Sequence, residues 1–162
     1  MRTAHSPHCG GNAMIDIQIT RFEQSHVQAV AQIEQACFAD PWTEDGLREE
    51  LDNSCARFLT AVTADGTVAG YIGCHTVLDE GYIANVAVSP VFRRQGIGRQ
   101  LVRTLLERSK DLAFVTLEVR ASNAAAIALY TECGFQSVGV RKKFYSHPTE
   151  DALLMTVFLQ AE

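Results

Sequence analysis

The segment from residue 83 to residue 99 combines residue types that could bind linked phosphate groups. The apolar run at 83–88 is typical of a strand, Ser89 and Pro90 end it, and an amphipathic helix is expected from about Ile97. Glycines allow positive φ and close backbone approach, and a helix N-terminus offers unpaired N–H groups at the positive end of its dipole. Strand, glycine turn and helix together predict a pyrophosphate site. The turn consists of Arg93, Arg94, Gln95, Gly96, Ile97, Gly98 and Arg99.

Two other phosphate-binding motifs are excluded at this turn. A dinucleotide fingerprint requires a third glycine at position 101, where the chain has Leu101. A Walker P-loop requires Gly-Lys-Ser/Thr, which the sequence lacks. A glycine-capped loop before an ordinary helix stays open as the structural alternative.

Glu118 and Tyr130 are titratable residues that could move protons during transfer to an amine. Such a reaction needs a base for the ammonium proton and an acid for the leaving group. Glu118 lies in a predicted strand, where alternation places it on a partly desolvated face. Tyr130 lies two helical turns after Asn123, on the same helix face. The residues alone also allow structural roles: a Glu118 paired with Arg120 or with the backbone, and a core tyrosine with a hydrogen-bonded hydroxyl.

Hydrophobic periodicity predicts the elements that position these residues. The order is β-α-α-β-β-β-α-β-α-β-β, which indicates an α+β domain with a mixed sheet and helices on both faces. Ser25 and Thr43 are candidate N-caps of the first two helices, and Gly134 is a candidate C-terminal cap of the last. Strands are expected at 15–20, 57–63, 68–77, 82–88, 114–120, 138–145 and 152–160, turns at 64–67 and 79–81, and the later helices at 97–110 and 123–133.

Composition limits the possible partners and compartments. The net charge of −5 argues against general nucleic-acid binding and suits a basic peptide. No apolar run reaches about 18 residues, so no membrane-spanning helix is expected. The five cysteines include no C-x-x-C pair and are expected to be reduced, which favours a cytoplasmic protein.

The N-terminus differs from the rest of the chain. Residues 1–13 are rich in Gly, Ser, His and Pro and are predicted to form a disordered extension, whereas 14–162 form one domain. His5, His8 and Cys9 could bind a metal, but a flexible polar tail offers no fixed ligand geometry, so no metal site is expected.

The glycine turn resembles the R/Q-x-x-G-x-G/A motif of the GCN5-related N-acetyltransferases (GNAT), through Arg93, Gly96 and Gly98. The resemblance spans residues 14–160. It implies a central, mostly antiparallel twisted sheet of about seven strands with a splayed parallel pair, and acetyl-CoA as cosubstrate. It further implies that the turn binds the CoA pyrophosphate and that Asn123, which with Ser122 is a candidate N-cap, contacts the cofactor. The pantetheine arm would bind the backbone of Val86, Ala87 and Val88.

A narrower resemblance is to the ribosomal-protein-alanine acetyltransferase (RimI) group. It is carried by residues 117–130 and 134–135, and by segments at 37–44, 85–88, 141–145 and 150–152. It implies transfer to the α-amine of an N-terminal alanine of a small-subunit ribosomal protein. Glu118 would be the general base, and Tyr130 the general acid close to the cofactor sulfur.

The peptide entrance is expected near Trp42 and Tyr145. Four acidic residues could attract a basic peptide there, or could form an ordinary solvated helix face: Glu44, Asp45, Glu49 and Glu50.

Three functional hypotheses follow. The first is direct N-terminal acetylation in a ternary complex, because Cys133, the nearest candidate for a covalent carrier, has no paired histidine. The second keeps the fold but changes the acceptor to a lysine or a small amine. The third is a CoA-binding module without catalysis.

Overall fold

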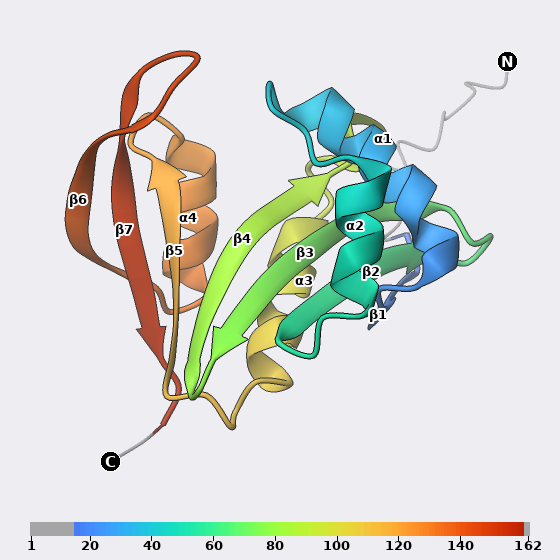
Figure 1. Ribbon diagram of the computed structural model, residues 1–162, viewed down its shortest axis with the longest axis horizontal. Helices are drawn as coiled ribbons and strands as arrows, with labels where there is room; N and C mark the ends of the chain where they lie inside the picture. Colours follow the sequence, from blue (N-terminus) through green and yellow to red (C-terminus); the bar gives the residue numbers. More distant parts are fainter. Residues whose placement is uncertain (1–14, 161–162) are drawn as a thin grey trace, which may run out of the picture.

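The computed structural model describes residues 15–160, so the predicted extension at 1–13 lies outside the described part (Figure 1). The predicted order of strands and helices is confirmed. The strands are β1 Ile17–Arg21, β2 Ala56–Thr63, β3 Val68–Val77, β4 Glu80–Val88, β5 Phe114–Arg120, β6 Gln136–Tyr145 and β7 Glu150–Phe158. The helices are α1 Val27–Cys37, α2 Glu44–Leu51, α3 Ile97–Glu107 and α4 Ala124–Glu132, with 3-10 turns η1 Gln24–His26 and η2 Pro90–Phe92.

The seven strands form one sheet in the order β1-β2-β3-β4-β5-β7-β6. Only the β4–β5 pair is parallel, and its register runs for three pairs, from Glu80 opposite Phe114 to Tyr82 opposite Thr116. Beyond these pairs the two strands diverge, and Figure 1 shows them as the arms of a V. The predicted mixed α+β fold with a splayed parallel pair is therefore confirmed.

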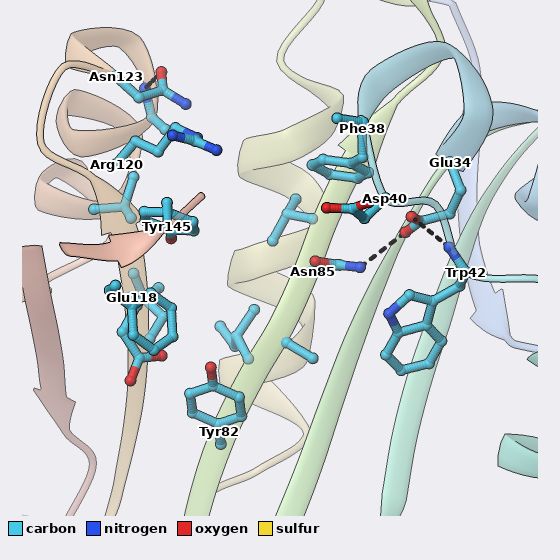
Figure 2. Close-up of a pocket in the computed structure, with 18 of the residues that line it drawn as sticks. Glu34, Phe38, Asp40, Trp42, Tyr82, Asn85, Glu118, Arg120, Asn123 and Tyr145 are labelled. Carbon is cyan, nitrogen blue, oxygen red and sulfur yellow. Dashed lines mark hydrogen bonds between the residues drawn. The ribbon is translucent and has the colours of Figure 1, made fainter. Parts of the chain in front are cut away.

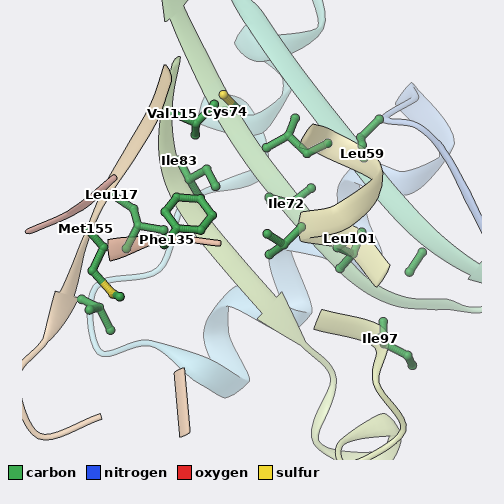
Figure 3. Packing of buried hydrophobic residues seen from close by; sticks show 14 of the residues in the cluster. Leu59, Ile72, Cys74, Ile83, Ile97, Leu101, Val115, Leu117, Phe135 and Met155 are labelled. Carbon is green, nitrogen blue, oxygen red and sulfur yellow. The ribbon is translucent and has the colours of Figure 1, made fainter. Parts of the chain in front are cut away.

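Helices cover both faces of the sheet, as predicted. Alternation along the strands sends Leu59 and Ile72 into a core cluster with α3, whereas Phe58 and Tyr71 pack with α1 and α2 on the other face. Figure 3 shows the first cluster, in which Phe135 packs among residues of β4, β5 and β7. The first cluster joins strands on both sides of the opening between β4 and β5, whereas the second packs α1 and α2 on β2, β3 and β4.

Three of the predicted caps are confirmed. The Thr43 hydroxyl accepts a hydrogen bond from the Gly46 N–H at 3.1 Å, which caps α2. Asn123, rather than Ser122, caps α4, because its Oδ1 accepts from the Ala126 N–H at 3.2 Å. Gly134 has φ +97 directly after α4 and so reverses the chain where other residues would be strained.

Other boundaries differ from the predictions. Ser25 is not an N-cap, because it lies inside η1 and α1 begins two residues later. The turn before β4 is placed at residues 78–79 rather than 79–81, because Leu78 takes the left-handed conformation with φ 54 and closes a two-residue loop. Helix α3 ends at Glu107, three residues before the predicted end. No helix within residues 15–160 is both long and apolar enough to cross a membrane.

Candidate active site

A cleft of about 450 Å³ opens where β4 and β5 part. Figure 2 shows its two walls facing each other across this opening. One wall is built by β5, α4 and the end of β6, and it includes Glu118, Arg120, Asn123, Tyr130 and Tyr145. The other is built by β4, α1 and the loop that follows α1, and it includes Glu34, Phe38, Asp40, Trp42 and Asn85.

Glu118 is almost completely buried in the first wall, with 6% of its side chain exposed. Its Oε1 forms an ion pair with Nε of Arg141 at 3.2 Å, rather than with Arg120. Its Oε2 is buried and has no hydrogen-bond partner among residues 15–160. An acceptor left without a donor costs roughly 1–3 kcal/mol, so this oxygen is available to a hydrogen-bond donor that enters the cleft.

Tyr130 reaches the same cleft from α4. This helix packs on the sheet face opposite to the one from which Glu118 projects. Its ring packs against Phe135 with ring centroids 5.7 Å apart. Burial is the main cause that raises the pKa of its phenol, with smaller contributions from Tyr145 and Cys133. Tyr130 therefore holds its proton at neutral pH. Glu118 and Tyr130, which are twelve positions apart in sequence, thus bring a carboxylate and a protonated phenol to one cavity.

Two further tyrosines surround Glu118. Burial, followed by the neighbouring Glu118 carboxylate, raises the pKa of both Tyr82 and Tyr145. Tyr145 lies beneath the guanidinium of Arg120, which is 4.4 Å from its ring centroid. Tyr145, which was predicted near the peptide entrance, lines the cleft, and so does Tyr82, which was not predicted there.

The opposite wall contains a buried carboxylate that the sequence analysis missed. Glu34 is fully buried, and its Oε1 accepts hydrogen bonds from the Tyr71 hydroxyl and, at 2.9 Å, from the Asn85 amide. Its Oε2 accepts from the Trp42 N–H at 3.3 Å (Figure 2). Burial raises the pKa of Glu34, although these hydrogen bonds oppose the shift. Glu34 thereby ties the loop after α1 to β3 and β4.

A sequence signal for Glu34 was present. Val27, Val30 and Ala31 mark the buried face of α1, and the next position on that face is residue 34. A glutamate at an apolar helical position indicates a buried hydrogen-bonded carboxylate, because an unpaired buried charge is strongly unfavourable.

The glycine turn has the predicted conformation at Gly96 but not at Gly98. Gly96 is the N-cap of α3 with φ +76, and no atom lies within 4 Å of the position that a Cβ would occupy. Arg94 is also left-handed, with φ 65. Gly98 is helical, and a Cβ there would lie 3.1 Å from Leu129 Cδ1, so this glycine serves the packing of α4 against α3.

The arginines of the turn have different partners. Arg93 Nη2 donates to Sγ of Cys37 at 3.4 Å, and Arg99 forms an ion pair with Glu132 of α4. The exposed turn and the first N–H groups of α3, which have no partner within the helix, leave donors available to an anion. The open space at Gly96 and these donors fit a pyrophosphate group.

The predicted backbone segment on β4 lies beside the cleft. Val86 lines it, whereas Ala87 is buried on the α1 side, and the Val88 carbonyl accepts from the Cys37 thiol at 3.5 Å. Asn123 lines the cleft while its Oδ1 caps α4.

Trp42 also lines the cleft and stacks against His75 at 6.2 Å between ring centroids. The four acidic residues of α2 are absent from the described lining of the cleft. Three of them form other pairs: Glu44 and Asp45 with Arg48, and Glu50 with His75. Glu44 and Asp45 thus belong to an ordinary solvated helix face. The carboxylates that line the cleft are instead those of Glu34, Asp40 and Glu118.

Known proteins are similar to this chain in sequence and in fold. The model of the acetyltransferase (GNAT) family matches residues 27–135. The [ribosomal protein bS18]-alanine N-acetyltransferases of Salmonella typhimurium and Escherichia coli are 40% and 38% identical to the chain over 146 residues. In both cases the alignment covers 86% of this chain and 95% of the relative.

The crystal structure of the Escherichia coli ribosomal-protein-S18-alanine N-acetyltransferase superposes with a TM-score of 0.82 at 34% identity. The superposition covers 91% of this chain and 96% of the other. Ard1 from Thermoplasma volcanium gives a TM-score of 0.79 at 26% identity, covering 90% and 99%. From the family match, the identity over most of the chain and the shared fold, the chain belongs to the GNAT family and is an acetyl-CoA-dependent N-acetyltransferase.

Proposed function

We propose that the protein acetylates the α-amine of an N-terminal alanine on a ribosomal protein of the bS18 type. The relatives that carry this activity in their names align over 95% of their own length. The observation that carries the proposal is the meeting of Glu118 and Tyr130 in one cleft, from opposite faces of the sheet.

The turn between η2 and α3 binds the CoA pyrophosphate in this proposal. Gly96 provides open space, and the backbone N–H groups of residues 94–99 provide donors at a helix N-terminus. Arg93, Arg94 and Arg99 add positive charge, although Arg99 also pairs with Glu132. The backbone of Val86, Ala87 and Val88 holds the pantetheine arm, and Asn123 contributes from the start of α4. When bound, acetyl-CoA supplies the acetyl thioester.

Glu118 and Tyr130 handle the two protons. Oε2 of Glu118 accepts no hydrogen bond from residues 15–160. It takes the proton of the substrate ammonium directly or through one water. Tyr130 keeps its hydroxyl proton because burial raises its pKa, and it donates this proton toward the departing sulfur. Each group supplies roughly 10²–10⁴-fold of the rate.

The acetyl group passes directly to the amine in this proposal. Burial is the first cause that raises the pKa of Cys133, so its thiol is protonated at neutral pH and is a weak nucleophile. Cys133 also lies outside the residues that line the cleft within the described part of the chain.

The acceptor enters between the loop after α1 and the end of β6. Asp40 and Glu118 place two carboxylates in this part of the cleft, where they can attract an ammonium group. Trp42 and Tyr145 provide flat apolar surfaces on opposite walls for the first residues of the peptide (Figure 2).

An acetylation assay with matched peptides tests the proposal. Peptides beginning with Ala, Ser or Met are compared with one whose only free amine is a lysine side chain. Wild type should prefer the Ala peptide, and Glu118→Gln and Tyr130→Phe should each lower kcat by roughly a hundredfold or more while CoA affinity changes little. Preference for the lysine peptide would refute the N-terminal acceptor, and full turnover by Glu118→Gln would refute the assigned base.

A further inference from the structure

Glu118 has one ion-pair partner in the part of the chain that the structure describes, the guanidinium of Arg141 on β6. The contact is one-sided: Arg141 Nε is 3.2 Å from Oε1, whereas Oε2 is buried and has no partner. Only 6% of the Glu118 side chain is exposed, against 56% for Arg141. An exposed arginine therefore reaches inward to a buried carboxylate.

The strand register explains how Arg141 reaches this position. Arg120 on β5 and Arg141 on β6 are both register partners of Ala152 on β7, which lies between them. Register partners in a sheet point to the same face, and so do residues two apart on one strand. Glu118 and Arg141 therefore share a face, with the small side chain of Ala152 between their strands.

Arg120 does not replace Arg141 at this site. Its guanidinium lies over the Tyr145 ring and donates to Glu150 and to the backbone carbonyls of Ser146 and Pro148. The phenols of Tyr82 on β4 and Tyr145 on β6 also lie near Glu118 and stay neutral at physiological pH. The Tyr82 hydroxyl is close enough to hydrogen-bond to the Glu118 carboxylate, but it adds no positive charge. Arg141 is thus the positive charge that holds Glu118.

We propose that Arg141 is a positioning residue for the base. It fixes Oε1 of Glu118 and orients the carboxylate so that Oε2 stays free to take the substrate ammonium proton. The proposal rests on the assignment of Glu118 as the base. Arg141 itself neither gains nor loses a proton in the reaction.

Turnover of Arg141 variants tests this role. Arg141→Gln should lower kcat for the Ala peptide by roughly ten- to a hundredfold, because a misplaced catalytic group loses rate on that scale. The KM of the peptide and the Kd of CoA should change little, and Arg141→Lys should recover part of the lost rate. Lys142→Gln is the matched control, since Lys142 is the exposed neighbour on the same strand and should keep wild-type kcat.

A double variant separates positioning from a general loss of structure. In the Glu118→Gln background, Arg141→Gln should cause no further loss, because the group that it positions is already absent. Addition of millimolar guanidinium ion to Arg141→Ala should raise kcat, and should not do so for Lys142→Ala. If Arg141→Gln unfolds, Arg141→Lys and this rescue decide the question.

The outcomes distinguish the two proposals. Low activity of Glu118→Gln together with wild-type kcat for Arg141→Gln would overturn the positioning role alone. Wild-type activity of Glu118→Gln would overturn the base assignment. Equal, additive losses from Arg141→Gln in both backgrounds would also overturn the positioning role.

Discussion

Two glycines with similar positive φ allow the proposed phosphate-binding role of the turn to be measured apart from its role in folding. Gly96 precedes α3 with φ +76, and Gly66 lies in the β2–β3 turn with φ +88. No atom lies within 4 Å of an added Cβ at either position, so alanine causes backbone strain without a steric clash. A left-handed alanine costs about 1–2 kcal/mol, which lowers the Tm of a domain of this size by roughly 2–8 °C.

The two variants should differ only in ligand binding. Gly96→Ala and Gly66→Ala should lose similar stability in thermal unfolding followed by circular dichroism. Gly96→Ala should also weaken CoA binding at least about tenfold, or 1.4 kcal/mol, because the methyl group fills the space left for the pyrophosphate. Isothermal titration calorimetry with CoA measures this difference, and Gly66→Ala should keep the wild-type Kd.

Two results would refute this reasoning. A wild-type Kd for Gly96→Ala would show that the phosphates do not use the open side of the turn. A large loss of stability in Gly96→Ala with none in Gly66→Ala would show that the strain estimate is wrong.

Two other regions give testable expectations. Burial raises the pKa of Glu34 above 4.5, so the folded state holds the Glu34 proton more tightly than the unfolded state. The stability gained from this proton is present below pH 4.5 and is lost as the pH rises through the folded-state pKa. The unfolding free energy of wild type minus that of Glu34→Gln should therefore fall as the pH increases from 4.5 to 8 in urea titrations, and a pH-independent difference would contradict this. Burial raises the pKa of Cys74 to about 11, whereas Cys55 is exposed. At pH 8 iodoacetamide should label Cys55 well before Cys74 in the folded protein, as read by peptide mass spectrometry, and equal labelling rates would contradict the burial of Cys74.

Much of the fold could be predicted because its signals are local. The bounds of β3 and β5 agree with the predicted ranges, and Thr43 and Asn123 cap their helices by hydrogen bonds to residues three positions later in sequence. The predicted boundaries were wrong where a residue adopted a conformation other than the one that its type favours. Ser25 entered a 3-10 turn instead of capping α1, and Leu78 took the left-handed conformation usually left to glycine.

The site was predictable in its chemistry but not in its partners. Glu118 and Tyr130 could be placed in one cleft from strand and helix periodicity together with the family resemblance. The pairing of Glu118 with Arg141 could not be predicted. The two residues are 23 positions apart in sequence, and β7 lies between their strands. Likewise, Gly98 was assigned to ligand contact, whereas its missing side chain makes room for Leu129, a contact that depends on how α4 packs.

The three-pair register between β4 and β5 leaves the remaining length of each strand with one backbone edge that pairs with no other strand of residues 15–160. Free strand edges usually lie on a protein's outside, where they invite association with other chains. Here the two edges face each other across the cleft, so an extended molecule in the cleft can hydrogen-bond to main-chain groups that a strand of another protein reaches less easily. The incomplete sheet therefore presents hydrogen-bonding groups that belong to the backbone and do not depend on the side chains around them.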